Sequence, residues 1–306
     1  MNKPYAGPYV LGFDGGGTKT KVSVGDLKGQ IICNLQGGSL NINSQGEEGL
    51  KATMTELFQT LQEQGFSWEQ LQGLCIGVAG ISNPLTRKVL LQSVQAAGIA
   101  REPILVGDHQ AALYGAHEGA PGMIMIAGTG SICYGENAAG EAARAGGWGH
   151  LIDDEGSAYA LGRDVLAAVV QAEDGRIPPT CMRKAVFEQI HAASIQELIQ
   201  YVYSPATGKK GVAALAPIVM QGVEAGEEAA IAILQKAAEK LASLVKPVAV
   251  RLGLTAGSLA LCGGVITQNE VLQNMLRSIL METLPELNVI LPKQDAAAGA
   301  VLRCLK

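Results

Sequence analysis

Gly12-Phe13-Asp14-Gly15-Gly16-Gly17-Thr18-Lys19-Thr20 is the stretch of sequence that decides the fold of this chain. The apolar run 9–13 before it is typical of a buried strand, and residues 21–25 after it alternate polar and apolar side chains as a second strand does. A turn with three successive glycines leaves its backbone N–H groups uncovered, and glycine tolerates positive φ, so such a turn can wrap an anion. We therefore predict a β-hairpin whose turn binds phosphate.

The residues around the glycines add the chemistry that phosphate binding needs. Asp14 at the strand end is placed to hold a hydrated Mg²⁺, while Thr18 and Lys19 offer a hydroxyl and a positive charge to the phosphates. A P-loop is excluded because Thr18 follows the last glycine and no helix pattern follows it. A dinucleotide fingerprint is excluded because the glycines lead into a strand. The alternative is a glycine-rich hairpin turn without a ligand.

Composition narrows the class of protein. The chain has 306 residues, which favours two domains, and its 48% hydrophobic and 17% charged residues indicate a globular protein. A net charge of −5 without a cluster of Lys and Arg argues against nucleic acid and membrane partners. The six cysteines include no Cys-x-x-Cys pair, the start of the chain lacks a signal-peptide pattern, and no apolar run approaches 18 residues. We expect a cytoplasmic protein with reduced cysteines.

Apolar patterns along the first part of the chain predict a five-stranded mixed sheet with helices on its faces. The expected strands are 9–14, 19–25, 30–35, 74–78 and 103–106, and the expected helices are 47–64, 84–98 and 108–116.

The same order of elements then begins again, which predicts an internal duplication. The second series has strands 122–127, 132–135, 140–145, 258–262 and 288–291, helices over 154–254 and from 269, and a last helix at 295–304. We predict an α/β protein of two similar domains that face each other across a cleft. One domain is residues 1–116 completed by the C-terminal helix 293–306, and the other is residues 117–292.

Four features fall at strand ends or in turns, where open α/β sheets bind ligands. They are residues 14–18, Asp108, the second Gly/Thr turn 128–131, and residues 262–265 with their pair of glycines. Gly/Thr hairpins on two domains can bind a nucleoside triphosphate, and the glycine pair lets a nucleoside lie flat on the backbone. All four features in this order are a more specific indication of nucleotide binding than any one of them alone.

The chain resembles the actin-like ATPase and sugar kinase superfamily, and within it the BadF/BadG-type ATPase family in the branch that contains N-acetylglucosamine kinase. The resemblance covers nearly the whole chain. It is carried by residues 14–20, by Ala127-Gly128-Thr129-Gly130-Ser131, and by the run from Gly146-Gly147-Trp148-Gly149 to Asp154-Glu155-Gly156-Ser157-Ala158-Tyr159. It implies two duplicated ribonuclease-H-like domains, ATP and Mg²⁺ as cofactors, a homodimer, and phosphorylation of the 6-hydroxyl of N-acetylglucosamine.

The resemblance also assigns roles to residues. Asp14 would lie near Mg²⁺, and Asp108 would be the base that accepts the proton of the sugar 6-hydroxyl. Nucleotide binding would fall to Gly15, Gly16, Gly17, Thr18, Lys19, Gly128, Thr129 and Gly130 at the phosphates and to Gly263 and Gly264 at the adenosine. The sugar would be bound by Asn41, Asp108, Ser131, Gly147, Trp148 and Asp154.

Other interpretations stay open at this point. Asp108 can be a helix N-cap, Asp154 and Glu155 can open a helix, and Trp148 can be a core residue. The sugar can be glucosamine or N-acetylmuramic acid, which differ from N-acetylglucosamine at C2 and C3. A function of another class is the ATP-dependent redox activator of a dehydratase or reductase, which holds an iron–sulfur cluster on cysteines.

Overall fold

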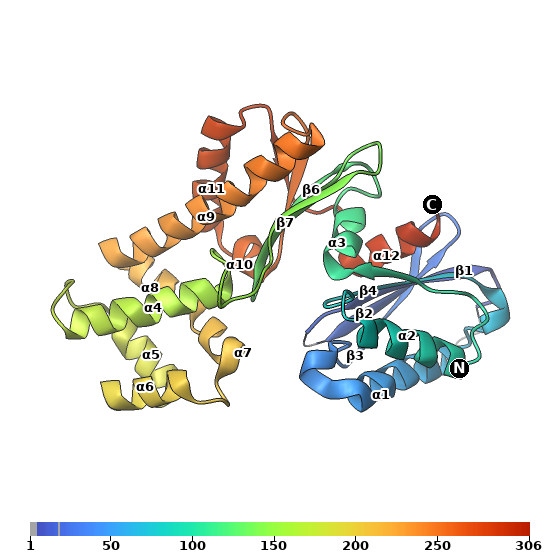
Figure 1. Cartoon of the computed structure of the whole chain (residues 1–306), viewed down its shortest axis with the longest axis horizontal. Coiled ribbons are helices and arrows are strands. Elements are labelled where there is room, and N and C mark those ends of the chain that lie inside the picture. Colours follow the sequence, from blue (N-terminus) through green and yellow to red (C-terminus); the bar gives the residue numbers. More distant parts are fainter. Residues whose placement is uncertain (1–4, 18) are drawn as a thin grey trace. The chain divides into compact units, whose positions relative to one another are not determined.

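A computed structural model describes residues 5–17 and 19–306, and the chain divides into two compact units. One unit comprises residues up to Pro121 together with Leu291–Lys306, and the other spans Gly122–Ile290. Each unit contains one five-stranded sheet with helices packed on it (Figure 1).

The sheet of the first unit has the strand order β3-β2-β1-β4-β5. Strands β1 (Tyr9–Gly15), β2 (Thr20–Asp26) and β3 (Ile31–Gly37) form an antiparallel meander, whereas β4 (Leu71–Val78) and β5 (Ile104–Gly107) run parallel to β1. The carboxyl ends of β1, β4 and β5 therefore lie at one edge of the sheet. The glycine turn after β1 and Asp108 after β5 lie at this edge.

Helices cover both faces of this sheet. Helices α1 (Ile42–Glu63) and α2 (Pro84–Ala96) lie on one face, and α3 (Asp108–Ala116) and α12 (Ala296–Cys304) lie on the other (Figure 1). The first pair encloses a core that includes Phe13, Met54 and Phe58, and the second encloses a smaller one around Cys75 and Ala300. Helix α12 packs on β1 and α3 although it comes from the far end of the chain.

The second unit repeats the strand pattern of the first. Its order is β10-β9-β6-β7-β8, in which β6 (Gly122–Ala127), β7 (Ser131–Glu136) and β8 (Ala142–Gly146) form the meander. Strands β9 (Ser258–Cys262) and β10 (Asn288–Ile290) run parallel to β6. The predicted fold class, two α/β units with duplicated sheets, is confirmed.

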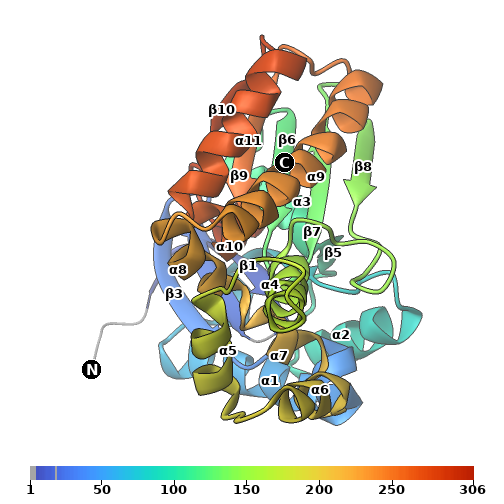
Figure 2. The same ribbon diagram turned by 90° about the vertical axis from the view of Figure 1, so that its left-hand side faces the viewer.

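Helices between β8 and β9 distinguish the second unit from the first. They are α4 (Ala158–Glu173), α5 (Met182–Ile190), α6 (Ile195–Tyr203), α7 (Gly208–Ala213), α8 (Val219–Glu224) and α9 (Glu228–Leu252). Helix α9 packs on β6, β7 and β8, and α11 (Glu270–Thr283) lies beside it (Figure 2). The short helices α10 (Gly264–Thr267), η1 (Trp68–Gln70) and η2 (Ala216–Ile218) complete the elements. Among the helices in the described ranges, none has both the length and the apolar character needed to cross a membrane.

The starts of two helices can be compared with the predictions. Element α1 comprises two helical pieces on either side of a kink at Gly46, which has a φ of 71°; the longer piece begins at residue 47 as predicted, and the short piece from Ile42 was not expected. Helix α4 begins at Ala158 instead of 154, because the Ser157 side chain accepts a hydrogen bond from the Ala160 N–H and caps it. Asp154 and Glu155 thus precede this helix and do not open it.

Candidate active site

The first glycine turn joins β1 to β2, which pair up to Gly15 and Thr20. The Gly16 N–H donates a hydrogen bond to the Lys19 carbonyl oxygen over 3.1 Å and closes the turn, and the Lys19 side chain is exposed. Thr18 lies outside the described residues. Gly15 has little free space around it, because an added Cβ would lie 3.0 Å from the Cβ of Leu40. None of glycines 15–17 has a φ in the left-handed region. The sequence suggested a positive φ in this turn, and these three glycines do not adopt one.

A polar segment before α1 supports this turn. The Ser39 hydroxyl donates to the Gly16 carbonyl oxygen over 3.0 Å and accepts from the Asn41 N–H over 3.0 Å. A Cβ built on Gly17 would lie 3.8 Å from Nδ2 of Asn41. Asn41, a predicted sugar ligand, therefore lies beside the first glycine turn. The sequence reasoning missed Ser39, although a Ser two residues before an Asn in a glycine-bounded loop is a turn signal.

Asp14 and Asp108 are brought to the same edge of the first sheet. Gly15 pairs with Val78, and Val78 pairs with Gly107, the residue before Asp108. The Asp108 side chain is 44% exposed, and its Oδ1 accepts from the His109 N–H over 2.9 Å.

Asp108 is not the N-cap of α3. That position belongs to Gly107, whose N–H donates to the Gln110 side-chain oxygen over 2.9 Å. Gly107 and Gln110 thus cap α3, which was the alternative role considered for Asp108. The exposed carboxylate of Asp108 is available for a ligand.

The electrostatics of this edge involve a third carboxylate. Burial, followed by the charges of Asp108 and Asp295, raises the pKa of Asp14 from 3.8 to about 6, and the charges of Lys21 and Lys19 partly oppose this shift. Asp295 caps α12 by accepting from the Ala298 N–H over 3.0 Å and forms an ion pair with Lys21. Burial disfavours the charge of Asp295, but these two contacts outweigh it and lower its pKa.

The sequence reasoning missed Asp295 and Lys21. Asp295 could have been found as a candidate N-cap before the apolar run of the last helix. Its closeness to Asp14 has no sequence signal, because the two residues lie at opposite ends of the chain.

This edge suits a hydrated Mg²⁺ better than a metal bound only by protein. Within the described part of the chain, no three His, Cys, Asp or Glu side chains are grouped in a way that could hold a metal. Mg²⁺ is usually bound by one or two carboxylates together with substrate phosphates. Asp14, partly buried and crowded by negative charge, matches this mode because a cation would relieve the cost of its ionisation.

The second glycine turn joins β6 to β7. The Gly128 N–H donates to the Gly130 carbonyl oxygen over 2.9 Å, and the Gly128 carbonyl oxygen accepts from the Ala158 N–H over 2.8 Å. Thr129 is exposed at the turn, and a Cβ on Gly128 would meet no atom within 4 Å. The turn is therefore fixed to the start of α4 while its outer side stays open.

Asp154 lies directly under this turn. Its residue exposure is 3%, its φ is 61°, and a Cβ on Gly130 would lie 2.8 Å from its Oδ2. The same Oδ2 accepts from Nζ of Lys209 over 2.7 Å, and the Ser131 N–H approaches Oδ1 at 3.4 Å. Three predicted site residues, Gly130, Ser131 and Asp154, are thus in contact. Sequence reasoning missed Lys209.

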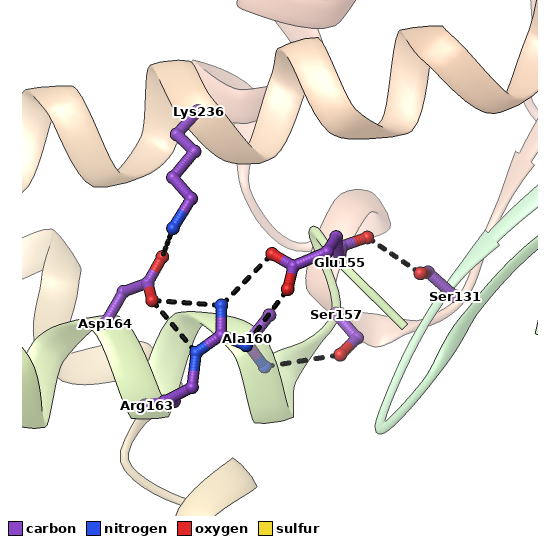
Figure 3. Close-up of polar contacts among 7 residues, drawn as sticks. All are labelled: Ser131, Glu155, Ser157, Ala160, Arg163, Asp164 and Lys236. Carbon is purple, nitrogen blue, oxygen red and sulfur yellow. Dashed lines mark hydrogen bonds and ion pairs between the residues drawn. The ribbon is translucent and has the colours of Figure 1, made fainter. Parts of the chain in front are cut away.

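An ion network holds Glu155, the residue that follows Asp154 in the chain (Figure 3). The guanidinium of Arg163 in α4 donates to both carboxylate oxygens of Glu155, over 2.9 and 3.1 Å, and this pairing lowers the pKa of Glu155. Asp164 joins Arg163 to Lys236 of α9, and the Ser131 hydroxyl donates to the Glu155 carbonyl oxygen over 2.7 Å. Glu155 therefore has a structural role.

The glycine-rich run after β8 presents Trp148 on the surface. Trp148 is 64% exposed, so it is not a core residue, and the Arg144 guanidinium lies 3.7 Å from its ring centroid. Gly147 has a φ of 73°, and a Cβ there would lie 3.0 Å from Ile132. The Asp153 carboxylate accepts from the Trp148 N–H over 3.2 Å, a loop contact that the sequence did not indicate.

The glycine pair after β9 lies next to the end of β6. Cys262 pairs with Ile126, and a Cβ on Gly263 would lie 2.4 Å from the Ala127 carbonyl oxygen. Gly263 also has a φ of 90°, so both space and backbone conformation require glycine. Gly264 follows as the first residue of α10. The bare backbone of this pair therefore lies beside the second turn.

Similarity to known proteins extends over the whole chain. A protein of Clostridium acetobutylicum named N-acetylmuramic acid/N-acetylglucosamine kinase is 35% identical over 297 residues, which are 96% of this chain and 97% of that protein. The N-acetyl-D-glucosamine kinase of Dictyostelium discoideum is 29% identical over 96% of this chain and 97% of its own.

Among solved structures, one from Chromobacterium violaceum, provisionally named an N-acetylglucosamine kinase, is 27% identical with a TM-score of 0.80 and covers 98% of this chain and 99% of its own. A ROK family glucokinase from Streptomyces griseus shares the fold with a TM-score of 0.64 at 16% identity. Residues 11–303 match one family throughout, and the chain belongs to the BadF/BadG/BcrA/BcrD ATPase family.

Proposed function

We propose that this protein is an amino-sugar kinase that transfers the γ-phosphoryl group of ATP to the 6-hydroxyl of N-acetylglucosamine. The observation that carries the proposal is the meeting of Asp14, Asp108 and the first glycine turn at one edge of the first sheet. The names of the relatives that match over nearly the whole chain support an amino sugar as the substrate.

Nucleotide binding is assigned to the two glycine turns and to the glycine pair after β9. In the first unit, the backbone of glycines 15–17 with Lys19 and Thr18 binds phosphate oxygens. In the second unit, Gly128, Thr129 and Gly130 do the same, and the open space on the outer side of Gly128 supports this role. Gly263 and Gly264 border the adenosine. Mg²⁺ held near Asp14 neutralises charge on the phosphates when it is bound.

Asp108 acts as the general base. It accepts the proton of the sugar 6-hydroxyl as that oxygen bonds to the γ-phosphorus, and the bond from this phosphorus to the bridging oxygen breaks to release ADP. Phosphoryl transfer depends chiefly on positioning and charge stabilisation, so an oriented carboxylate suffices. The His109 N–H orients this one, and it is exposed enough to meet a hydroxyl.

The residues assigned to the sugar are Asn41, Asp108, Ser131, Gly147, Trp148 and Asp154. The face of the exposed Trp148 indole that Arg144 does not cover, beside bare glycine backbone, offers an apolar surface to the acetyl methyl group. Burying one methyl gains roughly 1 kcal/mol, and a satisfied amide hydrogen bond about as much again. These terms favour N-acetylglucosamine over glucose.

A coupled assay of ADP release tests the proposal. N-acetylglucosamine, glucosamine, N-acetylmuramic acid and glucose are compared with Mg²⁺-ATP, and 6-deoxy-N-acetylglucosamine serves as the control without an acceptor hydroxyl. We expect N-acetylglucosamine to give the highest kcat/KM and the 6-deoxy sugar to give no product. ATP turnover that no sugar stimulates would refute a kinase function and favour the redox activator class.

A further inference from the structure

The charge environment of Asp154 has a feature that the proposed reaction does not use. Asp154 is nearly inaccessible, and its Oδ2 accepts a hydrogen bond from Nζ of Lys209 over 2.7 Å. Lys209 lies 55 residues further along the chain, on the short helix α7. A buried carboxylate is costly without a partner, so the pair is a single, internally neutral group.

The position of Lys209 is fixed by close packing of the backbone. Helix α7 packs against α4, where a Cβ added to Gly162 would lie only 2.0 Å from the Val212 carbonyl oxygen. Val212 and Ala213 are buried at this contact. This packing therefore fixes the position of α7, the helix that carries Lys209, relative to α4.

Lys209 retains hydrogen-bonding capacity beyond Asp154. An ammonium group has three N–H donors, and in the described part of the chain Asp154 is the one partner of this group. The Lys209 side chain is 30% exposed, so its remaining donors are open to solvent or a ligand. A positive charge with unused donors thus lies next to a carboxylate assigned to the sugar.

We propose that Lys209 is a specificity residue: its ammonium group makes the sugar site select N-acylated or carboxylate-bearing amino sugars and reject those with a free ammonium group. The inference rests on the proposed function, in which Asp154 contacts the sugar. Asp154 alone would attract a cationic amino group, whereas Asp154 paired with Lys209 presents no net negative charge and places a like charge nearby.

The other acidic residues of the loop do not reverse this effect. The Glu155 carboxylate is held at both oxygens by Arg163, which neutralises it. The Asp153 carboxylate accepts a hydrogen bond from the Trp148 N–H and is present in every Lys209 variant. A comparison among such variants therefore isolates the contribution of Lys209.

The test measures a ratio of kcat/KM values for N-acetylglucosamine and glucosamine at pH 6.5, where an amine of this kind carries its proton. Lys209→Met and Lys209→Gln remove the charge, Lys209→Arg retains it, and Lys184→Met removes an exposed lysine of α5 as the control. Because both sugars are measured on one preparation, the ratio does not depend on the fraction of folded enzyme. Gln retains a donor for Asp154 should the Met variant be unstable.

We expect both neutral variants to lower the ratio by about tenfold to a hundredfold, because they leave the Asp154 carboxylate without its positive partner and remove a like charge from the site. N-acetylmuramic acid should lose kcat/KM relative to N-acetylglucosamine in the same variants, while the Arg and Lys184 variants stay within about twofold of wild type. A ratio that the neutral variants leave unchanged overturns the role of Lys209 alone. A wild-type protein that phosphorylates none of these sugars overturns the proposed function itself.

Discussion

Replacing Asp14 by Asn should make the first unit more stable at neutral pH while abolishing kinase activity. Burial and the charges of Asp108 and Asp295 raise the pKa of Asp14 from 3.8 to about 6, so its ionised form is destabilised in the folded state. Each pKa unit corresponds to about 1.4 kcal/mol, and the full shift therefore corresponds to about 3 kcal/mol. Because Asp14 is only partly buried and solvent screens its charge, we expect a gain of about 1 to 3 kcal/mol.

The sign of the pH dependence follows from the direction of the shift. Between pH 3.8 and about 6 the folded protein keeps a proton that the unfolded chain has released. Stability contributed by protonated Asp14 is therefore complete below the lower value and lost as the pH rises through about 6. Asn has no proton to lose, so its advantage over wild type should be largest at pH 7.5 and fall to roughly a third at pH 4.5.

Urea unfolding followed by tryptophan fluorescence measures this effect. The chain has one tryptophan in each unit, and in a Trp148→Phe background Trp68, which packs against Phe58, reports on the first unit alone. Glu56→Gln, which removes an exposed carboxylate of α1, is the control. An Asp14→Asn variant that is no more stable than wild type at pH 7.5, or a gain that does not vary with pH, would refute the reasoning. Asp14→Asn in the otherwise wild-type protein should also lose turnover of Mg²⁺-ATP.

The remaining predictions concern the base, the packing of α12 and the substrate. Asp108→Asn should retain sugar and ATP binding by calorimetry but lose about 10² to 10⁴ in turnover, and near-normal turnover would remove Asp108 from the mechanism. Gly115→Ala should destabilise the first unit by about 1 to 3 kcal/mol in urea, although Ala favours helices, because its Cβ would lie 2.1 Å from the Asp295 carbonyl oxygen. An unchanged urea midpoint would contradict that contact. Glucose should fall behind N-acetylglucosamine by roughly tenfold to a hundredfold in kcat/KM, and equal values would exclude an acetyl-binding surface.

Much of the fold was predictable because its signals are local. Apolar runs bounded by glycine gave nine strands close to their observed positions, and β10, the shortest strand, was also expected within a residue of its end. The repeated order of strands predicted the duplication, which the matching sheets confirm. Helix starts were less predictable. Asp154 is an acidic residue of the kind that opens helices, yet its backbone is left-handed, and its carboxylate contacts Gly130 and Lys209.

The reasons for individual glycines also needed the structure. Glycines 15–17 suggested positive φ, but Gly15 has no positive φ and instead lies close to Leu40. Gly263 needs both a positive φ and room for the β6 backbone. Sequence alone does not separate these causes, because the crowding atoms belong to other elements.

The sequence by itself determined the class of the fold, the two glycine turns and the candidate carboxylates, because strand periodicity and turn chemistry act over a few residues. Only the tertiary structure decided which charges face one another. Lys21 and Asp295 are 274 residues apart and form an ion pair beside Asp14, and Lys209 reaches Asp154 from another helix. Such pairs depend on the close approach of elements distant in the chain, and the resulting burial and charge set the pKa of Asp14 and the charge next to Asp154.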